Sequence, residues 1–150
     1  MKFLVAIDGS QVSQKVVQKV LSLAVPCKAV VILLTVVEPI ANYYPKVMMP
    51  TGDWVTWQGT PDIELEKTLL NSSQTLLDNA AKTFRSAGLE CLTKLEIGSP
   101  RDVICSIASA ETPDFLALGS RGLGTVERLM LGSVSDYVVH HSSAPVIIVR

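Results

Sequence analysis

Residues 29–37 read AVVILLTVV, and this stretch decides the fold. All of its side chains are apolar except that of Thr35, and most are β-branched, which favours a strand. A strand that is apolar on both faces is typical of a parallel sheet covered by helices on each side. Residues 29–37 therefore predict an α/β protein built around a buried parallel sheet.

The segments around this strand alternate between the strand and helix patterns. Residues 2–7 form a short apolar run, and apolar side chains then recur at spacings of three and four from Val12 to Ala24, which predicts a helix closed by Pro26. The later elements predicted in the same way are a helix between Thr60-Pro61 and Gly88, a strand over 89–97, a helix that begins at Ser99-Pro100, a strand over 115–118, a short helix over 133–141 and a strand over 145–149. The order β-α-β-α-β-α-β-α-β predicts a single-domain, doubly wound, five-stranded parallel sheet of the Rossmann-like class, with helices on both faces.

The composition limits the class of protein. The chain has 150 residues, of which 48% are hydrophobic and 18% charged, and its 13 Lys and Arg nearly balance its 14 Asp and Glu. This length predicts one domain, residues 1–150. A disordered segment needs lower hydrophobicity and a higher net charge, and a nucleic-acid-binding protein needs a basic excess. The composition therefore argues against both classes.

Patterns for targeting and for membrane insertion are missing from the sequence. Only the five apolar residues 3–7 precede Asp8, whereas a signal peptide needs an apolar core of roughly 7–15 residues. The longest apolar stretch, residues 29–37, falls short of the ~18 residues that span a membrane. The cysteines are isolated and are expected to be small buried hydrophobes in a reducing compartment: Cys27, Cys91 and Cys105. We expect a cytoplasmic protein without a membrane partner.

Two loops are the candidates for chemistry, because ligands of doubly wound sheets bind beyond the carboxyl ends of the strands, where the winding reverses. One loop begins at Asp8, and the other reads GSRGLG over residues 119–124. The helix that begins at Gly132-Ser133 offers free N–H groups to an anion, and the hydroxyls of Ser133 and Ser135 and the charge of Arg121 suit a phosphate. The alternative is that the glycines only turn the chain and Ser133 is only a helix cap.

Two common nucleotide motifs do not fit this loop. The dinucleotide fingerprint is GxGxxG after the first strand, whereas this chain has GxxGxG after its fourth. A Walker A loop needs Gly-Lys followed by Ser or Thr, and the sequence contains no Gly-Lys pair. The chain is therefore neither a typical NAD enzyme nor a P-loop ATPase.

Three stretches carry a resemblance to a known family. They are FLVAIDGS at 3–10, VILLTVVEP at 31–39, and residues 119–150, where the pattern G-x2-G-x9-G-[S/T] is met by Gly119, Gly122, Gly132 and Ser133. With them, the chain resembles the universal stress protein family over its whole length except residues 38–62. The resemblance implies an adenine nucleotide alpha hydrolase-like fold and membership of the ATP-binding branch.

The resemblance also implies a site for an adenine nucleotide, which is ATP, AMP or cyclic AMP. The cofactor-binding residues that it implies are Ala6, Ile7, Asp8, Ser10, Val36, Gly119, Arg121, Gly122, Gly132, Ser133, Val134 and Ser135. In this arrangement Asp8 and the backbone of Ala6 and Ile7 lie beside the adenosine, Val36 lies against the adenine, and residues 132–135 hold the phosphate tail. The family pairs through its last strand, which implies a homodimer formed by Val146 to Val149.

Asp8 has two interpretations from the residues alone. At the end of a first parallel strand it suits a ribose hydroxyl, or a magnesium ion, which prefers phosphates plus one or two carboxylates. An aspartate before Gly-Ser is also a common turn former or helix cap. The only histidines, His140 and His141, lie near the end of the last predicted helix, where we expect a structural role.

Residues 38–62 form an insert of 25 residues that holds four of the eight aromatic residues of the chain, Tyr43, Tyr44, Trp54 and Trp57. Structureless loops above about 12–15 residues are usually functional or disordered. The insert is expected to be a loop that serves as a lid or as the surface for a protein partner, or a loop whose aromatic side chains dock onto its own domain.

The first functional hypothesis is a homodimeric ATP-binding protein of stress response or signalling, which acts as a sensor or switch and not as a dedicated enzyme. A slow ATP hydrolase or phosphotransferase is one alternative, for which Asp8 is the one obvious base. The other is a nucleotide-independent interaction module that works through the insert and the last strand.

Overall fold

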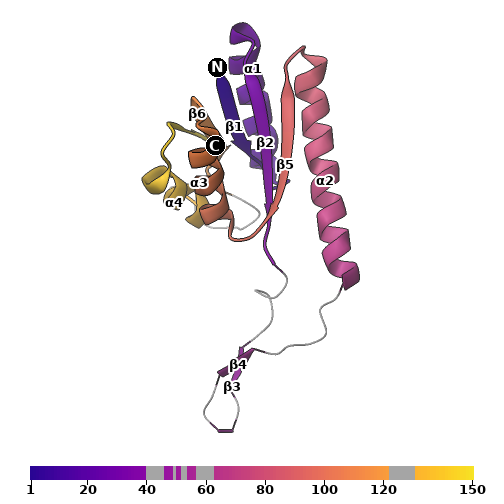
Figure 1. The fold of residues 1–150 in the computed structure, drawn as a ribbon, viewed down its shortest axis with the longest axis vertical. Helices are drawn as coiled ribbons and strands as arrows, with labels where there is room; N and C mark the ends of the chain where they lie inside the picture. Colours follow the sequence, from indigo (N-terminus) through magenta and orange to yellow (C-terminus); the bar gives the residue numbers. More distant parts are fainter. Residues whose placement is uncertain (40–45, 49, 52–53, 57–62, 122–130) are drawn as a thin grey trace.

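The computed structural model describes residues 1–39, 46–48, 50–51, 54–56, 63–121 and 131–150 (Figure 1). Their helices and strands are, in chain order, β1 (Lys2–Ala6), α1 (Gln11–Cys27), β2 (Val30–Val37), β3 (Lys46–Met48), β4 (Trp54–Thr56), α2 (Ile63–Ser86), β5 (Cys91–Ile97), α3 (Pro100–Glu111), β6 (Phe115–Gly119), α4 (Ser133–His141) and β7 (Val146–Val149).

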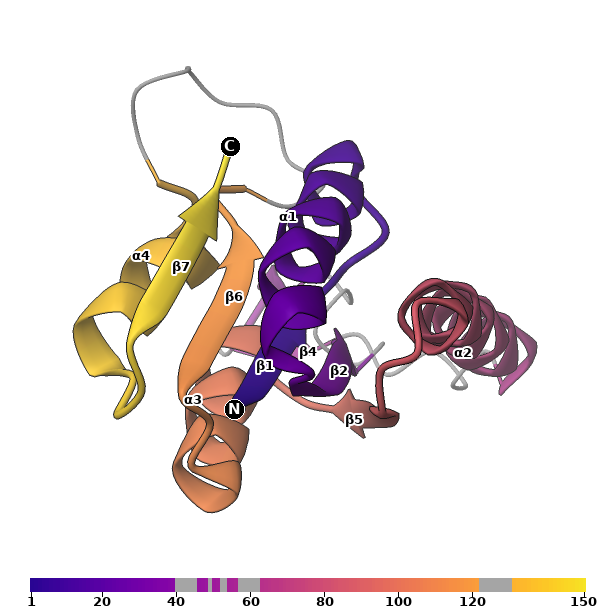
Figure 2. The ribbon, with the colours of Figure 1, turned by 90° about the horizontal axis from the view of Figure 1, so that it is seen from above.

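Five of the strands form one parallel sheet in the order β5-β2-β1-β6-β7. Seen from above, α1 and α2 lie on one face of this sheet and α3 and α4 on the other (Figure 2). The chain winds outward from β1 through β2 to β5, and then in the opposite direction through β6 to β7. The doubly wound, five-stranded parallel sheet with helices on both faces is confirmed.

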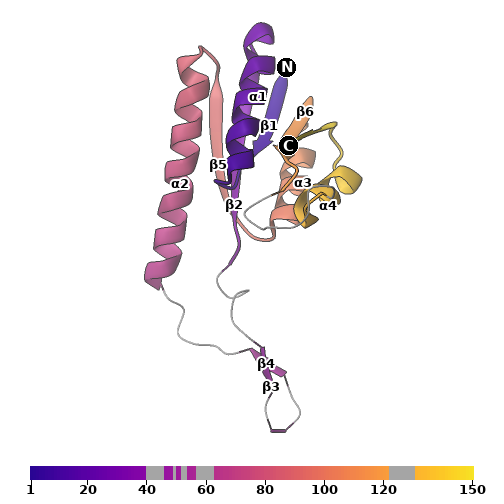
Figure 3. The same cartoon turned by 180° about the vertical axis from the view of Figure 1, so that it is seen from behind.

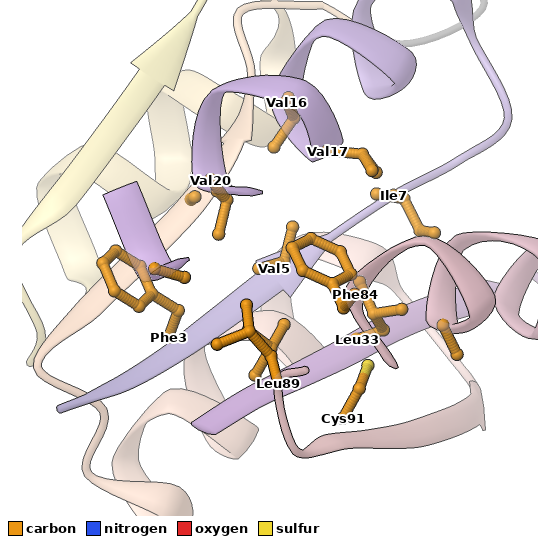
Figure 4. Close-up of a cluster of buried hydrophobic side chains, with 14 of the residues drawn as sticks. Phe3, Val5, Ile7, Val16, Val17, Val20, Leu33, Phe84, Leu89 and Cys91 are labelled. Carbon is orange, nitrogen blue, oxygen red and sulfur yellow. The ribbon is translucent and has the colours of Figure 1, made fainter. Parts of the chain in front are cut away.

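The stretch at 29–37 forms β2 and supplies both halves of the core. Val31 and Leu33 point to the face covered by α1 and α2, and Ile32 and Leu34 point to the face covered by α3 and α4, all at most 1% exposed. In the first of these clusters, valines of α1 and Phe84 of α2 meet side chains of β1 and β2 (Figure 4). Full burial of each such side chain stabilises the fold by about 1.5–3 kcal/mol, so apolarity on both faces of this strand is a requirement of the sheet.

The first helix does not end before Pro26. It continues through this residue to Cys27, and Lys28 then adopts a left-handed conformation with φ 48°. A proline lacks the N–H that continues a helix, but here it falls in the last turn. The turn is closed instead by the N–H groups of Lys28 and Ala29, which donate to the carbonyls of Val25 and Ala24.

Two other helix ends can be compared with the sequence. The stop at Gly88 is confirmed: this glycine has φ +80°, and the N–H of Leu89 donates to the carbonyl of Phe84. Helix α3 begins at Pro100 as predicted, although the Ser99 side chain makes no capping hydrogen bond. The predicted start of α2 at Thr60-Pro61 lies outside the described residues.

The insert contains two short strands that the sequence did not predict. Strands β3 and β4 pair antiparallel, with Lys46 opposite Thr56 and Met48 opposite Trp54. The pair stands apart from the five-stranded sheet, past the end of β2 (Figures 1 and 3). Tyr43, Tyr44 and Trp57 lie outside the described residues.

The cysteines differ in burial. All three are free, but the expectation of burial is wrong for two of them: Cys105 is only half-buried, and Cys27 is exposed. Cys27 lies in the last turn of α1, on the solvent side. Cys91 is buried on β5, and burial raises the pKa of its thiol. Within the described ranges, none of the helices is long and apolar enough to cross a membrane.

Candidate functional site

A cavity of about 560 Å³ opens at the carboxyl ends of β1, β2 and β6, where the winding of the sheet reverses. Its volume lies in the range of small-molecule sites, roughly 300–1,000 Å³. The described residues that line it are Ala6, Ile7, Asp8, Ser13, Leu34, Val36, Pro100, Ile104, Leu118, Gly119, Arg121, Leu131, Gly132, Ser133, Val134 and Ser135. All of the site residues implied by the sequence are among them except Ser10 and Gly122.

One side of the cavity is apolar. Leu34 and Val36 come from β2, Leu118 from β6, and Pro100 and Ile104 from the first turns of α3. Only Val36 was anticipated. The other four were not predicted, because apolar residues in strands and helices are expected to belong to the core. The sequence does not show which of them lie at the carboxyl end of the sheet, where the cavity opens.

Asp8 also lines the cavity, at the turn that leads from β1 into α1. Gly9 makes this turn with φ +81°, a conformation that favours glycine. The carboxylate oxygen Oδ1 of Asp8 accepts hydrogen bonds from the backbone N–H of Ser10, at 3.0 Å, and from the hydroxyl of Ser13. Among the described residues nothing binds the other oxygen, Oδ2. One oxygen of this exposed carboxylate is therefore fixed, and the other is available to a ligand.

The backbone of Ile7 is partly occupied within the fold. Its N–H donates to the carbonyl of Leu34 at 2.9 Å, and its carbonyl accepts from the buried hydroxyl of Thr35 at 3.0 Å. A carbonyl has two lone pairs, so the Ile7 carbonyl keeps one for a ligand, whereas its N–H has none to offer.

Two of the implied site residues are not placed in the cavity. Ser10 is buried and caps α1, where its Oγ accepts a hydrogen bond of 3.1 Å from the N–H of Ser13. It does not line the cavity. Gly122 lies outside the described residues.

Gly119 is required for packing, in addition to its predicted role in the approach of a ligand. A Cβ at this position would lie 2.8 Å from Cγ1 of Val12 and 3.1 Å from the carbonyl oxygen of Arg121. These neighbours are protein atoms of α1 and of the following loop. The absence of a side chain at Gly119 is thus required by the packing of α1 against β6, before any ligand is considered.

The start of α4 forms the polar end of the cavity. Gly132 is the N-cap, so the alternative that Ser133 caps this helix is wrong. The N–H of Gly132 donates to the carbonyl of Ser120 at 2.8 Å. The helical hydrogen bonds begin with the N–H of Asp136, so the N–H groups of residues 133–135 have no helical partners. Three backbone donors at the positive end of a helix are an arrangement that favours an anion.

The two serines in this turn differ in role. The hydroxyl of Ser135 is buried and donates to the carbonyl of Ser120 at 2.7 Å, so its proton is committed within the fold. Ser133 is exposed and can donate its hydroxyl to an anion. Arg121 is the only basic side chain, and Asp8 the only acidic one, among the described lining residues.

The described residues contain no group of three or more His, Cys, Asp or Glu side chains that could hold a metal ion. A cation in the cavity would therefore depend on Asp8 and on the oxygens of the ligand. His140 and His141 are outside the lining, and the Nδ1 atoms of both lie 2.8 Å from backbone carbonyls of α4.

A second, shallower groove of about 880 Å³ follows the far edge of the sheet. It is lined by Leu131, Val139, Ala144, Pro145, Val146, Ile148 and Arg150. In the sheet, β7 pairs with β6 on one side and is the last strand on the other. Within the described ranges no strand pairs with the outer edge of β7, which is bordered mostly by apolar side chains.

Two relatives show how far the sequence similarity extends. Universal stress protein YxiE from Bacillus subtilis is 29% identical over 152 aligned residues, which cover 99% of this chain and 98% of YxiE. The universal stress protein A-like protein from Arabidopsis thaliana is 36% identical over 75 residues, 50% of this chain. That match covers only 43% of the Arabidopsis protein, so the chain spans about half the length of some curated relatives.

Solved structures share the fold at lower identity. A universal stress protein in complex with cAMP has a TM-score of 0.70 at 22% identity, covering 100% of this chain and 97% of the other. An Arabidopsis thaliana family member with AMP bound has a TM-score of 0.68 at 23% identity, covering 99% and 90%. The Archaeoglobus fulgidus protein in complex with dAMP has a TM-score of 0.61 at 19% identity, covering 100% and 98%.

The comparison with family models covers the whole chain. The family described as "Universal stress protein family" matches residues 1–150, which include β1, the loop after β6 and the start of α4. This chain therefore belongs to the universal stress protein family.

Proposed function

We propose that this protein binds an adenine nucleotide in the cavity at the carboxyl ends of the strands and acts as a stress-response or signalling protein. The observation that carries the proposal is that one cavity brings together three kinds of surface. They are an apolar wall, the carboxylate of Asp8 and the free amides of a helix start. These surfaces suit the base, the ribose and the phosphates of a nucleotide.

The apolar wall suits a flat nucleobase. Val36, Ile104 and Leu118 bring aliphatic surface from a strand, a helix and a second strand. Burial of a base against such surface is favourable in proportion to the apolar area removed from water. Polar recognition of the base then falls to backbone groups such as the remaining lone pair of the Ile7 carbonyl.

The phosphates of the ligand are assigned to the start of α4. The N–H groups of residues 133–135, the hydroxyl of Ser133 and the guanidinium of Arg121 are the donors there. Ser135 contributes its amide and not its hydroxyl, because the hydroxyl already donates to Ser120. If ATP brings a magnesium ion, Asp8 is the acidic side chain among the described lining residues that would hold it.

Relatives support the choice of adenine. Three family members with this fold have structures with cAMP, AMP or dAMP. These ligands share the adenine and differ in their ribose and phosphate groups. We therefore assign the apolar wall of the cavity to the adenine. Within this proposal ATP with magnesium is the first ligand to test.

Isothermal titration calorimetry with ATP, AMP and cyclic AMP, each with and without magnesium, tests the proposal. We expect binding by the wild type and a loss of about tenfold or more in ATP affinity for Asp8→Asn, since a hydrogen bond to a charged group is lost. Asp78→Asn removes an exposed carboxylate of α2 that is not part of the cavity lining and is the matched control. Folded protein that binds none of the three ligands at millimolar concentration would overturn the proposal.

We further infer that two chains pair through β7 to form a homodimer. The open edge at Val146–Val149 and the apolar groove beside it support this inference. The cytoplasm is the compartment we propose.

The insert at 38–62 is assigned to a lid or a protein partner. Deletion of residues 40–58 separates these roles: lost ATP affinity favours a lid, and lost partner binding with intact ATP affinity favours a partner surface.

A further inference from the structure

We propose that Ser13 is a positioning residue of this site, which holds Asp8 so that a single carboxylate oxygen faces the ribose hydroxyls of the ligand. The inference rests on the proposed nucleotide function and deepens it, because it makes the site selective for ligands that carry a free ribose hydroxyl.

The two residues are joined in both directions. The hydroxyl of Ser13 donates to Oδ1 of Asp8, and it accepts a hydrogen bond of 3.0 Å from the backbone N–H of Asp8. The same Oδ1 accepts from the N–H of Ser10 at 3.0 Å. The side chain and the backbone of Asp8 are therefore tied to the first turn of α1.

Ser13 has no remaining capacity to bind a ligand itself. A serine hydroxyl has one proton and two lone pairs. The proton goes to Asp8, and the lone pairs accept from the Asp8 N–H and from the hydroxyl of Ser10, which lies 3.3 Å away. Ser13 is 5% exposed although it lines the cavity. Its effect on a ligand must therefore pass through Asp8.

The position of Ser13 is itself fixed. Its backbone N–H donates to the capping hydroxyl of Ser10 at 3.1 Å, and its neighbours Val16 and Val17 are buried in the core cluster on the α1 side of the sheet (Figure 4). The chain of contacts thus runs from the core through α1 to the carboxylate. Without the Ser13 hydroxyl, the exposed Asp8 side chain would keep only the hydrogen bond from the Ser10 N–H, and its second oxygen would be less well fixed.

A carboxylate that is already ordered loses less conformational freedom when it accepts a ribose hydroxyl. Because Oδ1 has two donors, Oδ2 is the oxygen left for the ligand. The predicted consequence is a gain in affinity that depends on the hydroxyl. A nucleotide that lacks both ribose hydroxyls receives no such gain.

The test compares ATP with 2′,3′-dideoxy-ATP by calorimetry. The variants are Ser13→Ala, Asp8→Ala and the double variant. In Ser13→Cys a weak thiol donor takes the place of the hydroxyl in nearly the same space, which protects the test if the alanine variant does not fold. Ser22→Ala removes an exposed hydroxyl of the same helix and is the control. Circular dichroism melts establish that each variant is folded.

We expect the wild type to prefer ATP by about tenfold or more, since the hydroxyl bond to a charged group is lost in the dideoxy ligand. Ser13→Ala and Ser13→Cys should lower ATP affinity about threefold to tenfold, because the Asp8 side chain must then be ordered when the ligand binds. The affinity for dideoxy-ATP should change by less than about twofold, because this ligand has no ribose hydroxyl for Asp8 to accept. In the Asp8→Ala background, Ser13→Ala should have no further effect.

Three results would overturn the inference. They are an equal loss for both ligands in Ser13→Ala, a further loss when Ser13→Ala is added to Asp8→Ala, and a wild type that binds both ligands equally. In each of these the nucleotide function stands. A folded wild type that binds neither ligand is a different outcome, in which the proposed function itself fails and the role of Ser13 fails with it.

Discussion

The buried hydroxyl of Ser135 donates a hydrogen bond of 2.7 Å to the backbone carbonyl of Ser120, and so joins the first turn of α4 to the end of β6. The same carbonyl accepts the N–H of Gly132 at 2.8 Å. Two donors from one helix start thus meet a single acceptor in the residue that follows β6. The orientation of the proposed anion site relative to the sheet depends on this junction.

Ser135→Ala should therefore lower the free energy of unfolding by about 1–2 kcal/mol, because a buried hydrogen bond is lost while the Ser120 carbonyl keeps one donor. Urea denaturation measures this difference. Ser133→Ala, which changes an exposed serine two residues earlier in the same turn, is the control and should change stability by less than about 0.5 kcal/mol. Equal stability of the two variants would contradict the assigned roles.

Gly119→Ala should destabilise the protein by about 1–3 kcal/mol, since the added Cβ would overlap Val12. Thermal or urea denaturation measures the effect. The double variant with Val12→Ala should recover part of the loss, because the contact at 2.8 Å disappears and the one at 3.1 Å to the Arg121 carbonyl remains. A single variant as stable as the wild type would show that the strand and helix can separate without cost.

Val139→Glu should convert the proposed dimer to a monomer. Val139 lies on α4, is 41% exposed and borders the groove along β7, where a buried charge without a partner is unfavourable. Sedimentation equilibrium measures the mass. Val25→Glu changes a helical valine of similar exposure, 42%, on α1 and should leave the dimer intact. A wild type that is monomeric, or a Val139→Glu dimer of unchanged affinity, argues against pairing through β7.

Glu111 gives a pH dependence of stability. Its carboxylate lies 2.7 Å from the Lys94 ammonium, and this hydrogen bond and charge, with Lys2 at 3.8 Å, hold the pKa of Glu111 below its usual range. A carboxyl whose pKa is lower in the folded state stabilises the fold above its unfolded pKa, and this contribution is lost as the pH falls through the folded value.

Glu111→Gln should therefore have a lower urea midpoint than the wild type at pH 7, and the difference should shrink as the pH is brought below the ordinary range of a glutamate. Urea titrations at a series of pH values measure the two curves. Glu90→Gln removes an exposed carboxylate and is the control. A difference between wild type and Glu111→Gln that stays constant down to acid pH would show that the ion pair with Lys94 does not stabilise the fold.

The sheet could be predicted because residues 31–34 have no polar face, and only a strand between two helical layers buries both faces. Cap positions such as Gly88 could be predicted because a left-handed turn favours glycine. The end of α1 could not be predicted, because the cost of Pro26 to the helix depends on whether this residue falls in the last turn. Strands of three residues in the insert carry too short a pattern to be recognised.

The candidate site was predictable in part, for a similar reason. Asp8 and Ser133 are polar residues at turns, so the sequence marks them. Leu34 and Leu118 are indistinguishable in the sequence from the core residues beside them, because the position of a cavity is set by where several strands end together. The role of Ser13 depends on a turn that brings it back to Asp8, and neither residue shows this alone.

Among the described lining residues, the groups assigned to the phosphates are helix amides, the hydroxyl of Ser133 and one arginine, in a protein whose formal charge is −1. Long-range attraction of a charged ligand needs a strong field from many like charges, and it weakens with salt, whereas contacts with fixed dipoles act at short range. A nucleotide would then reach this site without electrostatic steering. Its rate of association and its occupancy should vary little between low and high ionic strength.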